Sequence, residues 1–543
     1  MAGGGGDRRV AATVPRTGSR GFVLLAVLLG CLAVAVRLGP VLHRSSLRGV
    51  IGYDDGVHLA AAQHLLAGSL PYTDFTFLQP GGVVVALAPF AALAGLVGDS
   101  WAMAAARVAT VLVAALSAVL VAAILRPRGW TAAVVGGVLY ATWGTITIAE
   151  RTVYLEPLLN VCVLVALLAL RRPSGLAGPA SRAVRVAAAM AGLAVSFKLW
   201  GAVDVLVLGA LVWARAGLRA VGRGALWCVA GLSPALALAA ADPAAAWRDI
   251  VVVQQARPAN PTGVLDRIGA LVAPVALTDP TIGRGLAAAG GLLLMALCAA
   301  PLVRALATRQ APAAWADPVW WGLLALAQLA LLLAAPSWGT HYTASVGPAL
   351  CLLLGAAAGR AARRMPAPGR PWAVAGAAVL AVPIVVSGVV APGWGRPLDN
   401  EPLADFAREH RCVWSATPSL LAAADAGRRQ IRADCPDVVD IFGVRLALAA
   451  GEPTPELARA DARAGSAASG SAASGTPASG AGTPRGLAAD ERIIAAQLAD
   501  SQAALLAHQS SANEMSPALE EWLRAEFVQV GRNHYAGLWT RLP

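Results

Sequence analysis

Long apolar runs separated by short charged segments dominate the first 390 residues of the chain. A helix needs roughly 20 apolar residues to cross the hydrocarbon layer, and fitting such spans to this pattern predicts about eleven transmembrane helices. We place these spans near residues 22–42, 102–125, 131–148, 157–170, 184–199, 201–214, 225–241, 283–303, 319–335, 342–359 and 372–390. Two of the spans, 184–199 and 201–214, are short, but the arginines that flank both ends of the pair require an even number of crossings.

One further apolar run, 81–98, does not fit as a span. Counting it as one would reverse the sides of the basic and acidic loops that follow, so we interpret it as a re-entrant or interfacial helix. The first span, 22–42, follows a basic flank as a signal peptide would. It is long and has no clear small-x-small cleavage site, which favours an uncleaved anchor.

Composition supports a polytopic membrane protein, because 57% of the residues are hydrophobic, 14% are charged and the mean hydropathy is +0.62. The formal charge of +12 comes from arginines that recur between alternate apolar runs, while the other loops carry Asp and Glu. This sorting is the positive-inside pattern, so the charge indicates topology and needs no nucleic-acid partner. It predicts a multi-pass protein of the plasma (inner) membrane whose tail, 1–21, is cytoplasmic.

From about residue 391 charged and apolar residues alternate and no further spanning run occurs. We predict a membrane module over 22–390 and a small extracytoplasmic α/β domain over 391–543. The Ser, Ala and Gly repeats of 465–486 have no side chains to bury, which indicates a disordered insertion. The elements expected in the domain are a strand at 413–416, helices at 417–426 and 514–526, and a hairpin over 527–542.

Cys412 and Cys435 both fall in this C-terminal domain, where the compartment permits oxidation. A disulfide between them would stabilise the domain by roughly 3 kcal/mol, and the alternative is two unrelated buried thiols. The other five cysteines lie in apolar spans and are expected to be small core residues.

The most informative polar feature is an acidic doublet, Asp54 and Asp55, directly after the first span. One aspartate of the pair could cap the helix that follows, since aspartate accepts backbone N–H bonds at a helix start. The other then remains free to take a proton from a hydroxyl group as a general base.

Lys198 is the only lysine in the chain and lies in an apolar segment. An ammonium group costs roughly 2.5–3.5 kcal/mol at mid-bilayer, which leaves two interpretations: a lysine that extends to the interface, or a ligand for a lipid phosphate at that depth. Other polar groups predicted at the same level also have structural explanations as interfacial anchors, helix-entry charges or aromatic-belt residues. They are Arg107, Glu150, Glu156, Arg257, His341 and Tyr342.

The order of these motifs resembles that of the GT-C superfamily of membrane glycosyltransferases. This superfamily includes the protein O-mannosyltransferases, the lipid A aminoarabinose transferases and the actinobacterial arabinosyl- and mannosyltransferases. The likeness covers about residues 22–390 and is most specific in the N-terminal half. It rests on Asp54-Asp55, then Gly68 to Phe75, then Gln79-Pro80-Gly81-Gly82, then Arg107, followed by the Glu156 loop, Lys198, the Arg257 loop and Tyr342 before Pro348.

The resemblance implies an all-α polytopic fold with an extracytoplasmic cavity for a polyprenyl-phosphate sugar and a glycan, lipid or protein acceptor. Asp54 would deprotonate the acceptor hydroxyl, and Asp55 would be its polar partner or a metal ligand. One base without an enzyme nucleophile implies an inverting transfer. The phosphate-binding candidates are Arg107, Lys198 and Arg257 with His341 and Tyr342 nearby, and the acceptor or metal candidates are Glu150 and Glu156.

No cofactor is implied with certainty, and a divalent cation is left open because no fixed pair of metal-binding carboxylates stands out. The alternative function is a secondary transporter with Lys198 and Asp204 as intramembrane charges. Such a transporter should show corresponding broken spans in two halves, and we find no internal repeat. A non-catalytic scaffold that displays the C-terminal domain would leave Asp54 unexplained.

Overall fold

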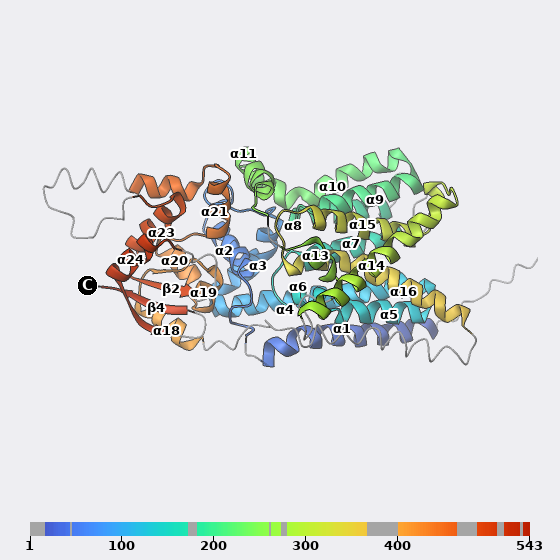
Figure 1. Ribbon diagram of the computed structural model, residues 1–543, viewed down its shortest axis with the longest axis horizontal. Helices are drawn as coiled ribbons and strands as arrows, with labels where there is room; N and C mark the ends of the chain where they lie inside the picture. Colours follow the sequence, from blue (N-terminus) through green and yellow to red (C-terminus); the bar gives the residue numbers. More distant parts are fainter. Residues whose placement is uncertain are drawn as a thin grey trace, which may run out of the picture.

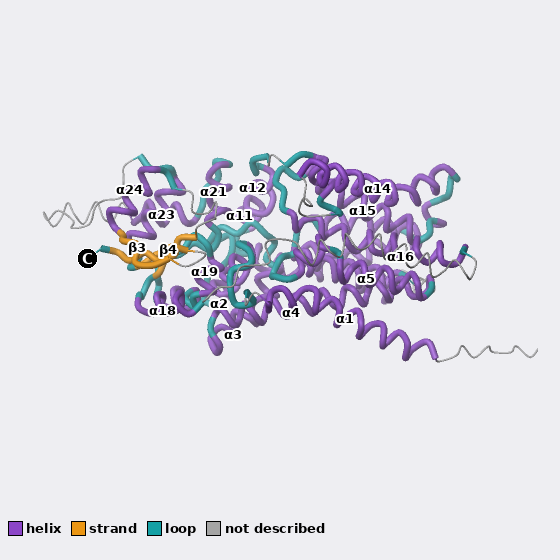
Figure 2. Tube along the Cα trace, turned by 60° about the horizontal axis from the view of Figure 1, so that its bottom comes forward, coloured by secondary structure: helices purple, strands orange, loops and turns teal. Residues whose placement is uncertain are grey.

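The computed structural model describes residues 17–43, 46–171, 182–259, 262–272, 280–365, 400–463, 486–507, 515–532 and 536–542. The molecule is elongated, with a helical bundle at one end and a mixed α/β domain at the other (Figure 1). The strands are confined to the C-terminal domain, as Figure 2 shows in orange.

Ten helices form the bundle among the residues that the structure describes, and further helices connect them. The bundle helices are α1 (Thr17–His43), α4 (Asp99–Leu125), α5 (Trp130–Thr142), α7 (Glu156–Leu170), α8 (Arg182–Phe197), α9 (Gly201–Ala216), α10 (Leu218–Ala239), α14 (Pro280–Ala307), α15 (Asp317–Ala334) and α16 (Gly347–Arg364). The connecting helices are α2 (Asp54–Leu66), α3 (Gly82–Val97), η1 (Arg126–Arg128), α6 (Gly144–Glu150), α11 (Pro243–Trp247), η3 (Arg248–Val252), α12 (Val253–Gln255), α13 (Val264–Gly269), η4 (Pro312–Ala314) and η5 (Thr340–Val346).

Within the described ranges, six helices are long and apolar enough to cross a membrane, or seven if α5 and α6, bent by 56°, form one span. The chain is thus a multi-pass membrane protein, but the predicted number of about eleven spans is not confirmed. The shortfall lies in α7, α8 and α9, which have only 15 to 16 residues each. At 1.5 Å per residue such helices are shorter than the roughly 30 Å hydrocarbon core. The last predicted span, 372–390, lies outside the described residues.

The apolar run at 81–98, which we excluded from the spans, forms the separate 16-residue helix α3. Its first turn lies against the end of α8: a Cβ atom on Gly82 would lie 2.4 Å from the backbone oxygen of Ser196. Only glycine permits this approach without a shift of one backbone. The contact brings the segment before α3 next to the turn that carries Lys198.

The C-terminal domain contains a four-stranded mixed sheet in the order β1-β2-β4-β3. The first two strands, β1 (Val413–Trp414) and β2 (Ala503–Ala507), are parallel, with Val413 opposite Ala503. The strands β3 (Phe527–Arg532) and β4 (Ala536–Arg541) form the predicted antiparallel hairpin, and β4 also pairs antiparallel with β2. The helices are α18 (Glu401–Glu409), α19 (Pro418–Ala423), α20 (Gly427–Arg432), α21 (Ile441–Ala449), α23 (Ala489–Ala499) and α24 (Pro517–Glu526).

Successive side chains of a strand point to opposite faces, and along β1 and the start of β2 both faces are buried, whereas most of β3 is exposed. Val413 and Leu505 pack on one side with apolar residues of α18 and α19. Trp414 and Ala504 pack on the other side with residues of α21, α23 and α24. The domain is therefore a sheet between two layers of helices. The predicted insertion, 465–486, lies almost entirely outside the described residues.

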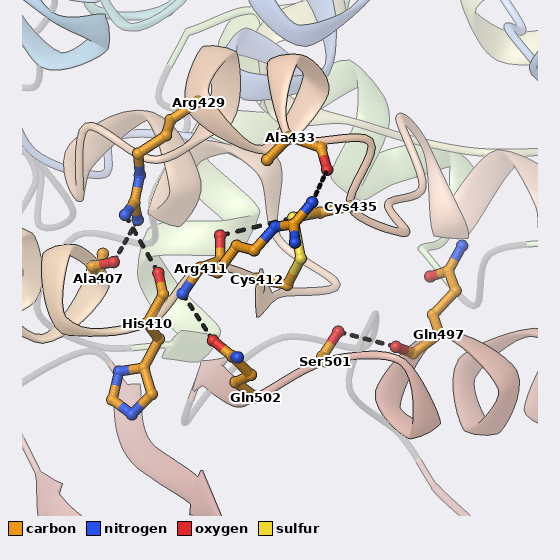
Figure 3. Close-up of a disulfide and its surroundings, with 10 residues drawn as sticks. All are labelled: Ala407, His410, Arg411, Cys412, Arg429, Ala433, Cys435, Gln497, Ser501 and Gln502. Atoms are coloured by element: carbon orange, nitrogen blue, oxygen red, sulfur yellow. Dashed lines mark hydrogen bonds between the residues drawn. A yellow bond between two sulfur atoms is a disulfide. The ribbon is translucent and has the colours of Figure 1, made fainter.

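A disulfide joins Cys412, just before β1, to Cys435 after α20 (Figure 3). Its Cα atoms are 5.5 Å apart. Arg411 reinforces the same connection, since its guanidinium donates to the carbonyl of Ala433 at 3.3 Å and its backbone N–H donates to Gln502 Oε1 at 2.7 Å. The bond thus ties the first strand to the helical layer on one side of the sheet.

The C-terminal domain rests directly on α2. A Cβ atom on Gly56 would lie 2.2 Å from the backbone nitrogen of Ser419 in α19, so glycine is required for this contact. The hydroxyl of Tyr53 donates to Asp440 Oδ1 at 3.0 Å. The residues on either side of the acidic doublet are therefore held by the C-terminal domain.

Candidate active site

A cavity of about 390 Å³ lies at the end of the bundle nearest the C-terminal domain. Its walls come from the start of α2, the segment before α3, the loop before α7, the turn between α8 and α9, the π-helical segment with α12, and the α15–η5 connection. The polar and aromatic side chains among its lining residues are Asp54, His58, Gln79, Tyr154, Glu156, Lys198, Trp200, Gln254, Gln255, Ser337, His341 and Tyr342. All the lining residues fall between Asp54 and Tyr342.

The two members of the acidic doublet lie in different environments. Asp54 is the first residue of α2, its side chain is 50% exposed, and it lines the cavity. Its Oδ2 atom is 4.0 Å from His341 Nε2. Asp55 is fully buried and is not among the lining residues. The divergence follows from helix geometry, since consecutive residues point about 100° apart.

Neither aspartate caps α2, so the alternative explanation of the doublet as a helix cap does not hold. The cap position is held by Tyr53, without a side-chain cap bond. Asp55 instead accepts hydrogen bonds from Arg107 Nη2 and Thr152 Oγ1, both at 2.6 Å and both on the same oxygen, Oδ2. It links α2 to α4 and to the loop before α7.

Arg107 lies in a sealed network away from the cavity. Its side chain is fully buried, and Nη1 donates to the carbonyls of Leu47 and Gly49 at 2.7 Å each. With Asp55 as its ionic partner, the guanidinium is not available to a carrier phosphate in this geometry. The structure therefore does not bring Arg107 to the cavity with the other predicted phosphate-binding residues.

Glu150 is likewise remote from the cavity. Its Oε2 atom forms a fully buried ion pair with Arg37 Nη2 of α1 at 2.5 Å, and its Oε1 atom accepts from the Tyr140 hydroxyl at 2.6 Å. Arg37 also donates to the carbonyl of Ala141 at 2.8 Å. This geometry places Glu150 in the packing of α1 on α5 and α6, away from the cavity that contains the other acceptor or metal candidate, Glu156.

Lys198 lines the cavity on the turn between α8 and α9 and is 6% exposed. Its ammonium group forms an ion pair with Glu156, the first residue of α7. The nitrogen also lies 4.4 Å from the centre of the Trp200 ring and 4.2 Å from that of Tyr342. A carboxylate and two aromatic faces offset the cost of removing the cation from water.

His341 completes this polar wall, as expected from its place beside Tyr342 in η5. Its ring stacks on that of Tyr154, with centroids 4.3 Å apart and an interplanar angle of 12°. Burial raises the pKa of Tyr154, and the negative charge of Asp54 raises it further. The phenol thus stays neutral, and its ring supports the histidine ring beside Asp54.

Arg257 lies at the rim, outside the set of lining residues. Its Nη1 atom donates to the hydroxyl of Ser337, which lines the cavity, at 3.2 Å. The guanidinium is also 5.8 Å from the ring of Phe442 in the C-terminal domain. Arg257 therefore marks the boundary between the cavity and that domain.

Sequence reasoning missed His58, which lies one turn after Asp54 on the same face of α2 and also lines the cavity. Its Nδ1 atom is 2.9 Å from the carbonyl oxygen of Val153. Its position four residues after Asp54, about one helical turn, could have identified it as a residue on the same face as Asp54. Gln254, in the loop that carries Arg257, also lines the cavity, and its side chain donates to the carbonyl of Leu78 at 2.7 Å.

The two charges on which a transporter would depend have different partners. Lys198 pairs with Glu156, whereas Asp204 is buried in α9 and accepts from Gln328 Nε2 of α15 at 2.7 Å. For metals, no three His, Cys, Asp or Glu side chains converge on one point among the described residues. The divalent cation left open above stays an untested prediction.

Comparison with known proteins defines the fold. No family model matches the sequence, and no curated protein matches it. The structure nevertheless has the GT-C fold that the motif order predicts, with the helical bundle and the C-terminal domain both matched.

The similar solved structures include ArnT from Cupriavidus metallidurans bound to undecaprenyl phosphate, with a TM-score of 0.51 and 19% identity over 96% of this chain and 98% of that one. The apo state of the same ArnT gives 0.52 and 18% over 97% and 99%. The archaeal oligosaccharyltransferase AglB from Archaeoglobus fulgidus, in complex with an inhibitory peptide and a dolichol-phosphate, gives 0.53 and 13% over 91% and 70%. At these identities the likeness establishes the fold.

Proposed function

We propose that the protein is an inverting glycosyltransferase that moves a monosaccharide from a polyprenyl-phosphate carrier to a hydroxyl group of a glycan, lipid or protein. The observation that carries the proposal is that Asp54, an accessible carboxylate, and Lys198, a buried ammonium, line one cavity. Two proteins of the same fold were solved with undecaprenyl phosphate and with a dolichol-phosphate, which are carriers of this class.

Asp54 is suited to act as the general base. Its side chain is half exposed and no cation lies closer to it than His341 at 4.0 Å among the described residues, so the carboxylate is free to accept a proton. Asp55 is fully buried and does not line the cavity, so it does not reach an acceptor bound there. The acceptor oxygen would bond to the anomeric carbon as its proton passes to Asp54.

The cations in and beside the cavity would stabilise the leaving group. As the bond between the anomeric carbon and the phosphate oxygen breaks, its electron pair remains on the phosphate. Lys198 carries three N–H donors and would bind this anion while remaining paired with Glu156. Arg257, at the rim beside Ser337, would add a second contact. A single displacement of this kind inverts the anomeric configuration.

The proposed orientation puts the cavity and the C-terminal domain outside the cytoplasm. The opposite end of the bundle, where Asp317 pairs with Arg128 at 2.6 Å and with Arg215 at 2.7 Å, carries the arginines. The positive-inside rule assigns that end to the cytoplasm of a plasma (inner) membrane. The carrier's hydrocarbon chain would then lie in the outer leaflet beside the cavity.

The test is transfer from a panel of labelled polyprenyl-phosphate monosaccharides to cell-envelope acceptors, with purified wild-type protein and the variants Asp54→Asn and Asp55→Asn. We expect Asp54→Asn to lower the rate by about 10²–10⁴-fold at an unchanged melting temperature, and Asp55→Asn to lower the melting temperature. The product should have the inverted anomeric configuration by NMR. Full activity of Asp54→Asn, or no transfer by wild type from any donor, would overturn the proposal.

A further inference from the structure

The arginine-rich end of the bundle, away from the sheet (Figure 1), contains a second cavity, of about 410 Å³. It lies between α14, α15 and α16, and its walls are mostly leucine, alanine and proline side chains, including Leu294, Leu353 and Ala357. Leu297 both lines it and is 40% exposed, so the cavity opens on the outward face of α14. That face would contact the bilayer.

Two arginines lie at the end of this cavity without a carboxylate partner. Arg304 of α14 and Arg360 of α16 both line it and both are exposed. Among the described residues neither has an acidic group within ion-pair distance, because Asp317 at the adjacent start of α15 is bound by Arg128 and Arg215. Further positive charge surrounds the pair, from Arg363 and Arg364 at the end of α16.

We propose that this cavity is a binding site for an anionic glycerophospholipid of the leaflet opposite the active site. The phosphate would lie between the guanidinium groups of Arg304 and Arg360, whose planar donors match phosphate oxygens. One acyl chain would fill the apolar space and enter it past Leu297. Basic pockets between transmembrane helices on the cytoplasmic side are typical sites for acidic lipid headgroups. The apolar walls favour a lipid over a free anion, since inorganic phosphate would leave them empty.

The experiment is native mass spectrometry of the full-length protein in detergent, titrated with phosphatidylglycerol and, separately, with phosphatidylcholine of identical chains. We expect phosphatidylglycerol to bind selectively and the variant Arg304→Gln/Arg360→Gln to weaken its binding by about 30-fold. The matched control is Arg219→Gln/Arg223→Gln, which removes two exposed arginines of α10 from the same end of the bundle but from outside the cavity. This control should change the affinity less than twofold.

A second variant tests the apolar part without a change of charge. Ala357→Trp fills the cavity and should weaken phosphatidylglycerol binding by at least tenfold, while inorganic phosphate should not displace the lipid. Equal losses in the two double-arginine variants, or equal binding of the two lipids, would show only diffuse attraction and overturn the proposal. Displacement by inorganic phosphate with no effect of Ala357→Trp would overturn it in favour of a free-anion site. Melting temperatures establish that each variant is folded.

Discussion

Two buried ion pairs, Arg107–Asp55 and Lys198–Glu156, lie near the C-terminal domain. Each joins one cation to one carboxylate, but the surroundings of the two pairs differ. The first is enclosed by backbone carbonyls and a threonine hydroxyl, and both side chains are fully buried. The second has two aromatic faces around its cation and forms part of a cavity wall. One pair is surrounded by protein on all sides, while the other borders a space for a ligand.

This difference shows that burial alone does not identify a functional charge. The guanidinium of Arg107 bridges α4 to the segment before α2, so its hydrogen bonds are all used within the fold. The ammonium of Lys198 contacts one carboxylate and two aromatic faces, with no backbone carbonyl among its described partners, and it borders the cavity. The comparison predicts that the first pair supports stability and the second supports transfer.

The largest expected effect is on folding. Arg107→Ala leaves Asp55 as a buried charge without its partner, which should lower the free energy of unfolding by about 3–5 kcal/mol. Thermal unfolding followed by size-exclusion chromatography in detergent measures this loss. Arg257→Ala, at a half-buried position with one hydrogen bond to Ser337, is the control and should melt close to wild type. Equal melting temperatures of the two variants would contradict the structural role of Arg107.

The next prediction removes both charges of the cavity pair. Lys198→Met/Glu156→Gln leaves no uncompensated charge, so stability should stay within about 1 kcal/mol while transfer falls by about 10²–10³-fold. The corresponding double variant Arg107→Met/Asp55→Asn should still be destabilised, because the carbonyls of Leu47 and Gly49 lose their donor. Normal transfer by the first double variant would remove Lys198 from the mechanism.

The third prediction concerns the pH dependence of stability. It arises at the contact between Tyr53, just before α2, and Asp440 of the C-terminal domain. Burial raises the pKa of Asp440 from 3.8 to about 6, even though Gly443 N–H and the Tyr53 hydroxyl bond to it. The neutral acid is therefore favoured by folding, and its stabilising contribution is present below about pH 4 and lost as the pH rises through about 6. The loss is up to about 3 kcal/mol.

Asp440→Asn keeps a side-chain acceptor for both hydrogen bonds and should remove this part of the pH dependence. Melting temperatures of wild type and variant between pH 4 and pH 7.5 measure it: wild type should lose more stability than Asp440→Asn as the pH rises. Parallel curves for the two proteins would show that Asp440 does not titrate in this range.

The smallest expected effect is on the docking of the C-terminal domain next to the sealed pair. Gly56→Ala introduces a methyl group where 2.2 Å separates it from the Ser419 nitrogen, and the required shift should cost about 1–3 kcal/mol. The control is Gly209→Ala in α9, where a Cβ atom meets nothing within 4 Å. Limited proteolysis should cleave Gly56→Ala faster than the control, and equal rates would contradict the contact.

The positions of most helices could be predicted from the sequence because long apolar runs leave little choice of structure. The number of full-length spans could not, because α8 and α9 are too short to cross the membrane singly and their pairing depends on packing. The hairpin of β3 and β4 was predictable from its local alternation. The parallel pairing of β1 with β2 joins segments about 90 residues apart, so no local sequence pattern could predict it.

The residues of the candidate site were likewise predictable only in part. Asp54, Glu156, Lys198, His341 and Tyr342 were predicted to share one level, and all five line the cavity. Arg107 and Glu150 were placed with them because sequence shows the charge of a residue and not its partner. Their partners, Asp55 and Arg37, are 52 and 113 positions away in the chain.

Every residue that lines the candidate active-site cavity precedes position 343, although the C-terminal domain rests on the loop that begins it. The cavity walls therefore come from the helical bundle alone, and Tyr53 and Gly56 couple them to the domain. Exchange of the domain would alter which molecules approach the opening, whereas the selection of the bound molecule would stay with the helices.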